Sequence, residues 1–378
     1  MDKLNLLINK IMCEVSDPSA TIKHSMDDGG RKAVGCMLEF CPEEIVYASG
    51  ALPVGLWSGG ATIRRASEYF PAFYCAPIQA NLELAMAGAY DGVLSALLVP
   101  ILCDALKSAG QNWRIAVPDI PMIPFVYPQN SHLEAGVEFL RSEYETVKTG
   151  LEETLGTEIT EEALEHAIGV YNRYNAVMRR FAKCAAEHPE VITPEVRHAV
   201  FQDGFFNDKE DYAGTVSELC DELDRLPQSE WQGRRVAVTG IMLDDQRTLK
   251  ELAKYGIAVT FDSLAQESGQ VNTDTPEGPD ALTRLALKWT NMKNSSLVLD
   301  LGKGRIDELL NAVKSGAADG VVYSMVSFCD PEEYDYPLLN KRLLDEGIPC
   351  LYVEFNGREA AEQNATRIQA FSEILERR

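Results

Sequence analysis

The chain has 378 residues, of which 46% are hydrophobic, and this is enough for two α/β domains that each bury a core. It carries 58 acidic residues against 35 basic ones, which gives a formal net charge of −23. Binding to nucleic acid by counterion release needs the opposite sign of charge, so we expect no nucleic-acid partner.

The N-terminal stretch "MDKLNLLINKIMCEVSD" alternates charged and apolar residues at helical spacing. It lacks the basic start, the long apolar centre and the small-residue cleavage site of a signal peptide. No window of the sequence approaches eighteen uninterrupted apolar residues, so no transmembrane helix is expected. The sequence therefore predicts a cytoplasmic protein without a membrane partner.

The first predicted α/β unit follows this N-terminal helix. Pro42 lies in the first turn of a short predicted helix and Gly50 just past its end. Strands that alternate with helices indicate a parallel sheet. The predicted elements are a strand at 31–40, the short helix at 41–50, a strand at 51–57, a helix at 76–90, a buried strand at 93–100, a helix after Cys103 and a strand at 113–118.

Long amphipathic helices are predicted from about residue 131 to residue 189. Thr160 is the expected N-cap of the clearest helix, and Pro189 is its expected stop. A further helix is predicted to begin with Thr193 as its cap and Pro194 at the first helical position. We therefore expect a helical insert between two sheets.

A second α/β unit is predicted in the last third of the chain. The polar segment 265–280 within it is too long for a simple connection, which makes it a candidate lid or substrate loop. The predicted strands lie at 231–243, 256–264, 295–301, 321–328 and 348–355, and a final helix runs from about 362 to 378.

The predicted fold class is thus α/β, with two Rossmann-like or flavodoxin-like parallel-sheet domains and a helical insert between them. The expected boundaries are 1–130 for the N-terminal helix and the first α/β domain, 131–230 for the insert and 231–378 for the second α/β domain.

The two α/β units contain a similar phrase. Residues 89–104, "AYDGVLSALLVPILCD", and residues 317–330, "AADGVVYSMVSFCD", both begin Ala-x-Asp-Gly-Val and end Cys-Asp. Cys103 and Cys329 therefore fall at the carboxyl ends of buried strands, where open parallel sheets bind ligands. Each precedes a helix whose positive N-terminal end can stabilise a thiolate, and Cys75 precedes a helix in the same way.

Three thiolates in this setting suit zinc or an iron-sulfur cluster. Zinc is the weaker interpretation, because the nine cysteines include no Cys-x-x-Cys pair and the five histidines show no metal-ligand spacing. A free cysteine is also commonly a small buried hydrophobe, so on the residues alone the role of Cys75, Cys103 and Cys329 stays open, as does that of Cys36 and Cys41. Core packing is the preferred interpretation for Cys13, Cys184, Cys220 and Cys350.

Other motifs in the sequence give weaker evidence of function. The sequence contains neither a Gly-x-Gly-x-x-Gly fingerprint after a strand nor a P-loop. Gly302, Lys303 and Gly304 precede a helix and could contact a phosphate, but an ordinary turn is favoured. Glu43 and Glu44 could supply acid-base chemistry, although carboxylates in the first turn of a helix more often stabilise its dipole.

Four segments together resemble the 2-hydroxyacyl-CoA dehydratase family, which includes the benzoyl-CoA reductase subunits. The similarity runs from about Arg31 to the end of the chain, and the Cys-Asp-Pro-Glu-Glu-Tyr-Asp-Tyr-Pro phrase looks like the smaller, beta-type subunit. The segments are "FCPEEIVYASGALPVGL", "LVPILCDALKS", "SFCDPEEYDYPLLNKRLLDEGIPCLYVEFN" and "ATRIQAFSEIL".

The resemblance implies a heterodimer with a homologous alpha subunit, in which each subunit binds one [4Fe-4S] cluster through three cysteines. Carried over to this chain, those ligands are Cys75, Cys103 and Cys329. It also implies an ATP-dependent iron-sulfur activator protein that delivers an electron, and a 2-hydroxyacyl-CoA substrate bound mainly by the partner. The absence of a P-loop from the sequence is consistent with nucleotide binding elsewhere.

The resemblance implies a radical dehydration to an enoyl-CoA. One electron added to the thioester carbonyl gives a ketyl radical that expels the adjacent hydroxide, which acid-base catalysis alone does not achieve. We interpret the chain as the beta subunit of an (R)-2-hydroxyacyl-CoA dehydratase and assign it no catalytic acid or base. The alternatives are a subunit of a benzoyl-CoA reductase-like or double-cubane cluster reductase, in which Cys36 and Cys41 would be added ligands, and a cluster-free scaffold subunit.

Overall fold

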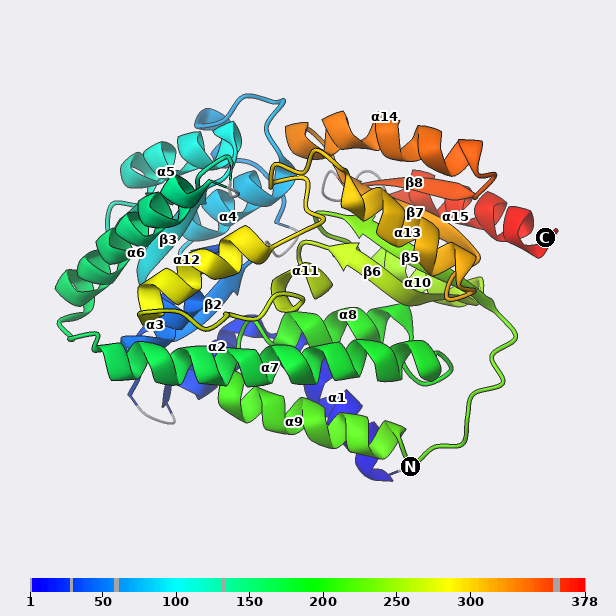
Figure 1. The fold of residues 1–378 in the computed structure, drawn as a ribbon, viewed down its shortest axis with the longest axis horizontal. Helices are drawn as coiled ribbons and strands as arrows, with labels where there is room; N and C mark the ends of the chain where they lie inside the picture. Colours follow the sequence, from blue (N-terminus) through cyan, green and yellow to red (C-terminus); the bar gives the residue numbers. More distant parts are fainter. Residues whose placement is uncertain (1, 28–29, 58–60, 131–132, 356–360, 378) are drawn as a thin grey trace.

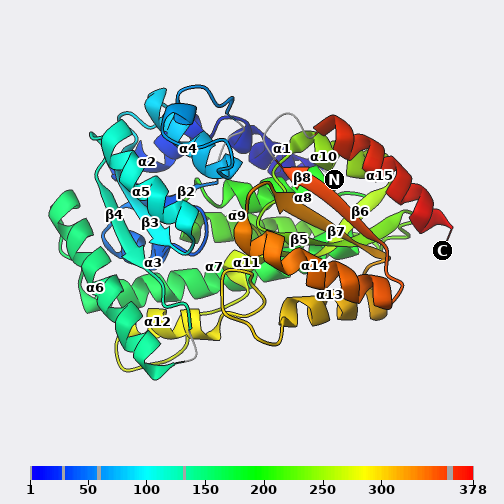
Figure 2. The same cartoon turned by 90° about the horizontal axis from the view of Figure 1, so that it is seen from above.

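The computed structural model describes residues 2–27, 30–57, 61–130, 133–355 and 361–377. These residues form two four-stranded sheets in which every pair of neighbouring strands is parallel. Each sheet has helices on both faces (Figures 1 and 2), which confirms the predicted α/β fold with two parallel-sheet units. No helix in these ranges is long and apolar enough to span a membrane.

The two sheets have the same topology. The first contains β1 (Ala33–Met37), β2 (Leu52–Leu56), β3 (Leu94–Ile101) and β4 (Met122–Val126), in the order β2-β1-β3-β4. The second contains β5 (Arg234–Gly240), β6 (Ile257–Leu264), β7 (Gly320–Val326) and β8 (Cys350–Phe355), in the order β6-β5-β7-β8. The strand order reverses between the first and third strands of each sheet, and ligands bind at such a switch point in open α/β sheets. β3 and β7, the two strands of the repeated phrase, occupy equivalent positions.

The helices between β4 and β5 form a layer that contacts both sheets. Thr160 and Thr193 cap α7 (Glu161–Glu187) and α8 (Pro194–Asp203) as predicted, since their side chains accept hydrogen bonds from the N–H groups of Ala163 and Val196. α7 spans both halves of the molecule in Figure 1 and contacts both α3 and β6. The remaining helices of this layer are α6 (Glu134–Leu155) and α9 (Lys209–Leu223).

The other helices complete the two halves and the chain ends. Two of them cross the predicted boundaries: α1 packs on α8 and α9, and α12 packs on α6 and joins the core of the first sheet. The limits at residues 130 and 230 therefore stay predictions, with contacts running across both. The helices outside the layer between β4 and β5 are α1 (Asp2–Ser16), α2 (Pro18–Asp27), α3 (Glu43–Ala48), α4 (Ala76–Met86), α5 (Asp104–Ala116), α10 (Gln246–Lys254), α11 (Ser268–Val271), α12 (Ala281–Asn291), α13 (Gly304–Lys314), α14 (Asp330–Asp345) and α15 (Ala361–Glu376).

Two strand predictions are wrong. Residues 113–116 of the strand predicted at 113–118 form the last turn of α5, because Trp113 continues the helical spacing of the buried residues Leu106, Ala109 and Gly110. The fourth strand of that sheet comes later, as β4. Residues 295–301 form turns and irregular structure, and the exposed Leu299 and Leu301 show that their apolar side chains do not enter a sheet.

Buried charges join α8 to the second sheet. The Arg197 guanidinium lies between the carboxylates of Asp262 and Glu267, and all three side chains are at most 5% exposed. His198 lies 3.0 Å from Asp244 through Nε2 and 2.9 Å from Glu267 through Nδ1. Burial by itself would lower the pKa of His198, but the two carboxylates outweigh burial and raise the pKa to about 10.

The stability of the fold is expected to depend on the charge of His198. Its folded-state pKa of about 10 lies above the ordinary value of 6.5, so its contribution is fully present below pH 6.5 and is lost as pH rises toward 10. Urea unfolding of the wild type and His198→Gln between pH 6 and pH 10 measures this. At pH 6 we expect the unfolding free energies of the two proteins to differ by a few kcal/mol, because each unit by which the pKa of His198 is raised contributes on the order of 1–2 kcal/mol. We expect this difference to shrink steadily as the pH rises to 10. A difference independent of pH would contradict the assignment.

Candidate metal centre

Cys75, Cys103 and Cys329 are the N-cap residues of three helices. Cys75 caps α4, Cys103 caps α5 and Cys329 caps α14, and each has an extended backbone that turns into the helix. The local sequence explains two of these helix starts, because proline follows within two residues of Cys75 and Cys329 and its fixed φ suits the first turn. Cys103 and Cys329 leave the equivalent strands β3 and β7, as the repeated phrase predicted.

The structure brings these three thiols together from both halves of the chain. The start of α14 is directed toward α4 and α5 in Figure 2. The charge on Cys103 raises the pKa of Cys75, and the charge on Cys75 raises that of Cys329, so the Cys75 sulfur lies within electrostatic range of both others. Cys329 is more than two hundred residues away in the sequence from both Cys75 and Cys103, so its proximity to Cys75 depends on the tertiary fold.

Burial is the largest influence on all three thiols. It raises the pKa of Cys75 to about 12, that of Cys103 to about 11 and that of Cys329 well above its usual range. None of the sulfurs makes a conventional capping hydrogen bond, but a backbone N–H three residues further on lowers each pKa in part. Those N–H groups belong to Ile78, Leu106 and Glu332. Without a nearby positive charge the three thiols therefore stay protonated at neutral pH, whereas a coordinating thiol is deprotonated by its metal.

Glu39 is a fourth member of this group that sequence reasoning missed. Its side chain is 4% exposed, and its charge raises the pKa of all three cysteine thiols. Burial raises the pKa of Glu39 itself to about 7. Its neighbours Leu38 and Phe40 both have a positive φ, at 56° and 61°, which is rare for residues other than glycine. No motif marks Glu39, although its position just past a strand end is the signal that selected Cys103.

Glu332 lies beside Cys329 and is held by cations and a phenol. The fully buried Glu332 carboxylate accepts hydrogen bonds from Tyr323 and, at 2.6 Å, from Arg305. Arg305 also donates to Asp335 at 2.9 Å, and Lys303 donates to the same carboxylate. The cations of the segment considered for phosphate binding are therefore paired with carboxylates of α14, which supports the ordinary-turn interpretation.

A cavity of about 340 Å³ lies next to this network, between the two halves of the molecule. Arg305 and Glu332 line it together with Phe40, Thr273 and Asp274. The predicted lid or substrate loop at 265–280 thus contributes to its wall. α11 occupies part of that loop, so the segment is more ordered than the sequence indicated.

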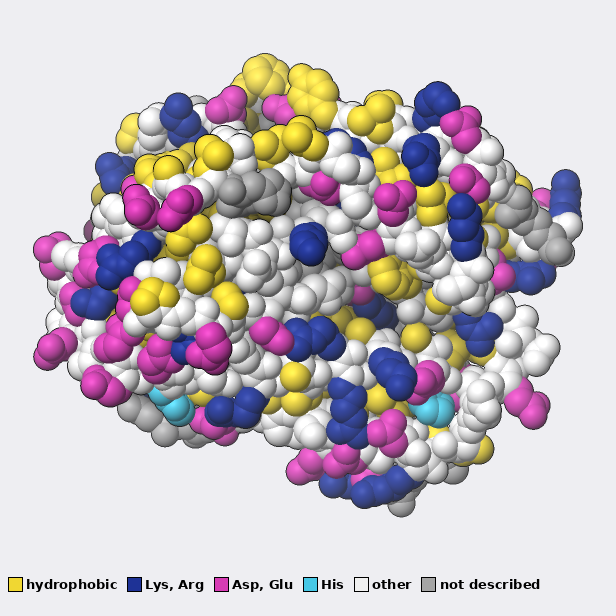
Figure 3. All heavy atoms as spheres, in the orientation of Figure 1, with side chains coloured by type: hydrophobic (Ala, Val, Ile, Leu, Met, Phe, Trp, Pro, Cys, Tyr) yellow, Lys and Arg dark blue, Asp and Glu magenta, His cyan; other side chains and the backbone are white. Residues whose placement is uncertain are grey.

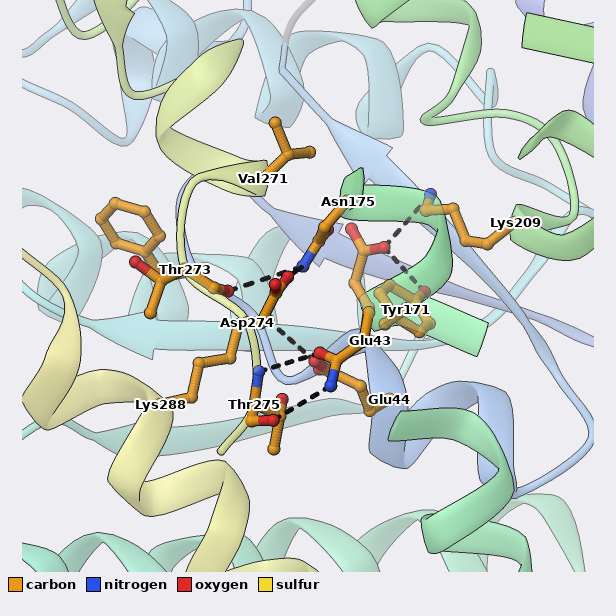
Figure 4. Close-up of polar contacts among 12 residues, drawn as sticks. Glu43, Glu44, Tyr171, Asn175, Lys209, Val271, Thr273, Asp274, Thr275 and Lys288 are labelled. Atoms are coloured by element: carbon orange, nitrogen blue, oxygen red, sulfur yellow. Dashed lines mark hydrogen bonds and ion pairs between the residues drawn. The ribbon is translucent and has the colours of Figure 1, made fainter. Parts of the chain in front are cut away.

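The loop is tied to α7 by polar contacts (Figure 4). The Asn175 side chain donates to the Asp274 carboxylate at 3.3 Å, and Arg179 forms an ion pair with the same carboxylate at 2.7 Å. The Thr275 N–H donates to the Asn172 side chain at 2.9 Å. These contacts anchor the wall of the cavity to the helical layer.

Glu43 and Glu44 are both ion-paired (Figure 4). Glu43 accepts a hydrogen bond from the Tyr171 hydroxyl at 2.9 Å and lies 3.2 Å from Lys209, and Glu44 lies 2.8 Å from Lys288. Their partners come from α7, α9 and α12, so these carboxylates connect α3 to the surrounding helices. This arrangement favours the structural interpretation over acid-base chemistry.

The remaining cysteines do not join the group of three thiols. Cys36 is 1% exposed, and the Cys41 sulfur contacts the carbonyl oxygens of Met37 and Leu98 at 3.9 Å. Cys184 and Cys220 are buried in the core between α7 and α9, as expected. Cys13 is exposed, so the expectation that it packs in the core is wrong: it lies on the solvent side of α1. Within the described ranges, no three histidine, cysteine or acidic side chains converge on a single ion; in a cubane cluster each cysteine binds a different iron.

Fold and site together define a class of protein: two parallel sheets of flavodoxin-like strand order, with cysteines at the N-caps of three helices. A family model described as 2-hydroxyglutaryl-CoA dehydratase, D-component, matches residues 39–375. The chain belongs to this family.

Three relatives show similarity over nearly the full length. The chain is 41% identical to the lactoyl-CoA dehydratase subunit beta of Anaerotignum propionicum, over 97% of this chain and 99% of the relative. It is 40% identical to the (R)-phenyllactyl-CoA dehydratase beta subunit of Clostridium sporogenes, over 96% of each. It is 37% identical to the (R)-2-hydroxyglutaryl-CoA dehydratase subunit beta of Acidaminococcus fermentans, over 92% of this chain and 93% of the relative. The resemblance to a beta-type subunit of a hydro-lyase is therefore confirmed.

Proposed function

We propose that the chain is the [4Fe-4S]-binding beta subunit of an (R)-2-hydroxyacyl-CoA dehydratase. The observation that carries this proposal is the position of Cys75, Cys103 and Cys329 at the N-caps of three helices, with Cys75 close enough to each of the other two for their charges to interact. Each relative named above is a dehydratase beta subunit, which supports the same reaction for this chain.

The donor set fits an iron-sulfur cluster. Thiolates are soft ligands that favour such clusters, and a cluster with three thiolates carries net negative charge. Three helix N-termini with their N–H groups directed at the sulfurs provide the matching positive field. When bound, the cluster supplies single-electron chemistry, which lets a 2-hydroxyacyl thioester lose its hydroxyl group by way of a ketyl radical.

The residues of this chain hold and enclose the site. Arg305 and Tyr323 fix Glu332 beneath Cys329, so the first turn of α14 is held against β7. The side chains of Phe73 and Phe328, next to two of the ligand cysteines, are 70% and 48% exposed. In Figure 3, hydrophobic side chains gather along the upper edge of the molecule, which is where α14 begins in the matching view of Figure 1. The thiols thus lie just beneath the surface, within reach of an electron donor.

The proposal includes two protein partners. The relatives are named as beta subunits, which implies an alpha subunit, and we propose that it holds most of the 2-hydroxyacyl-CoA substrate. We further propose that an ATP-dependent iron-sulfur activator supplies the starting electron. The acyl groups in the relatives' names differ, from lactoyl to phenyllactyl and 2-hydroxyglutaryl, so the choice of acyl chain is assigned to the complex with the alpha subunit.

Reconstitution tests the function directly. The chain is produced anaerobically with an alpha-type subunit, and water loss from (R)- and (S)-2-hydroxyacyl-CoA thioesters is followed with activator and ATP. We expect conversion of the (R) thioester to the enoyl-CoA at least ten times faster than that of the (S) thioester, with no turnover when this chain is omitted. Equal turnover without this chain, or reduction of an aromatic thioester in place of dehydration, would overturn the proposal.

A further inference from the structure

The three cysteines leave one corner of a cubane cluster without a protein ligand. A [4Fe-4S] cluster has four irons and is most often bound by four cysteines, whereas this site offers three. The inference that follows rests on the proposed cluster and concerns the group that meets the fourth iron. Such a donor must lie near Cys75, Cys103 and Cys329 and have other contacts that leave it available.

The nearby thiols and one carboxylate are already engaged. The Cys41 sulfur faces the carbonyl oxygens of Met37 and Leu98, and Cys36 belongs to β1 itself and is fully enclosed. Glu332 is bound by Arg305 and Tyr323, which satisfies its charge and its lone pairs. These groups would have to break existing contacts before they could bind a metal.

The first sheet places Glu39 at the edge from which Cys103 also projects, where it could bind the fourth iron. In the register of β1 and β3, Cys36 pairs with Leu98, so β3, which ends at Ile101, runs further along the same edge than β1, which ends at Met37. Glu39 lies two residues past the end of β1, and Cys103 lies two residues past the end of β3. The two side chains therefore leave the same edge on opposite sides of the point where the strand order reverses, which is where this type of sheet binds ligands.

The backbone around Glu39 is held in an unusual conformation. Leu38 and Phe40, on either side of it, are both in the left-handed region, which is unfavourable for residues other than glycine. The Tyr127 hydroxyl donates a hydrogen bond to the Phe40 carbonyl, and the Phe40 ring packs on Trp289 at 5.8 Å. These contacts fix the direction of the Glu39 side chain, and such conformations persist where the surroundings enforce them.

Among the described residues, no cation pairs with the Glu39 carboxylate, and its one hydrogen-bond donor is its own backbone N–H. A buried carboxylate without a cation is unfavourable, so charged groups of this kind are found paired or bound to metals. Its charge is among the main influences on the pKa of all three cysteine thiols. The missing cation would therefore be one that the three thiols also surround.

We propose that the carboxylate of Glu39 binds the fourth iron of the cluster held by Cys75, Cys103 and Cys329. The protein then supplies a donor to every iron, and the cluster has no open position for a substrate oxygen. An iron open to a substrate oxygen would then have to come from elsewhere in the complex.

Spectroscopy of the fourth iron tests this assignment. The chain is purified anaerobically as wild type, Glu39→Gln and Asp104→Asn, and the fourth iron is replaced with ⁵⁷Fe for Mössbauer spectroscopy. In the wild type we expect one iron site with an oxygen donor, distinct from the three sulfur-bound sites. In Glu39→Gln we expect that site to change, and oxidation with ferricyanide in the presence of a chelator to yield the [3Fe-4S] electron paramagnetic resonance signal at least ten times faster.

Asp104→Asn is the matched control. Asp104 is exposed, follows a ligand cysteine directly and acts on Cys103 through its charge, so the change removes the same unit of charge without removing a donor. We expect its fourth iron to behave as in the wild type. Equal rates of iron loss in all three proteins, or a fourth iron in the wild type that lacks an oxygen donor, would overturn the assignment of Glu39. Absence of iron from the wild type would instead refute the proposed cluster, so the two failures are distinct.

Discussion

Replacement of Cys329 by serine is expected to reduce the iron content of the anaerobically purified chain from about four atoms to well below one. The same result is expected for Cys75→Ser and Cys103→Ser. Each change removes one of three soft donors, and a serine hydroxyl is a harder and far less acidic ligand than a thiol. Iron and acid-labile sulfide per chain measure the loss, and dehydration by the reconstituted complex should fall by at least a hundredfold.

Two other cysteines provide controls for this experiment. Cys350 lies in β8 with its thiol mostly buried, and burial raises its pKa to about 12, as for Cys75. Cys13 is exposed on α1. Serine at either position should leave iron and sulfide at the wild-type level. Full iron content in the three ligand variants, or equal losses in the controls, would contradict the assignment of Cys75, Cys103 and Cys329.

Replacement of Arg197 by methionine is expected to destabilise the fold by about 3–5 kcal/mol. Arg197 is enclosed between Asp262 and Glu267, and its loss leaves two buried carboxylates with one cation fewer. The cost comes from the unpaired charges more than from the loss of attraction. The midpoint of urea unfolding measures the change, and urea is the suitable denaturant because it does not screen ion pairs.

The buried ion pairs of Arg197 can also be tested by replacing all three charged side chains at once. Removal of all three charges in Arg197→Met, Asp262→Asn, Glu267→Gln should recover part of the lost stability, since no unpaired charge remains. Arg180→Met is the exposed counterpart, because Arg180 pairs with Asp221 and Asp224 at the surface, and it should cost less than about 1 kcal/mol. A loss in Arg197→Met no larger than in Arg180→Met would show that the buried pairs do not stabilise the fold.

The position of the cysteines at helix starts was largely predictable, and the burial of Glu39 near them was not. The end of a parallel strand is readable from local sequence, so the repeated phrase placed Cys103 and Cys329 correctly before helices. Glu39 follows a strand in the same way, but a single glutamate after an apolar run is normally solvated. The neighbouring Phe40 is held by Tyr127 and Trp289, which lie far away in the sequence, so local sequence does not reveal the surroundings of Glu39.

The errors in the strand assignment have a common origin. Residues 113–118 and 295–301 are short apolar runs, and such runs suit a strand or a buried helix equally well. In the first case the helical spacing extends from α5, which buries Trp113 among helical neighbours. In the second case no neighbouring strand is available, so the run stays in turns with Leu301 exposed. Long-range contacts decided both outcomes.

The sequence by itself determined the alternation of strands and helices, the helix caps at Thr160 and Thr193 and the cysteines at the starts of three helices. These features depend on residues within a few positions of one another, whose conformational preferences are local. Only the tertiary structure decided that the thiols of the two halves meet, that Glu39 joins them without a counterion and that α12 returns to the first sheet. Those outcomes depend on how separate elements bury their apolar faces together, and no local pattern in the chain encodes that choice.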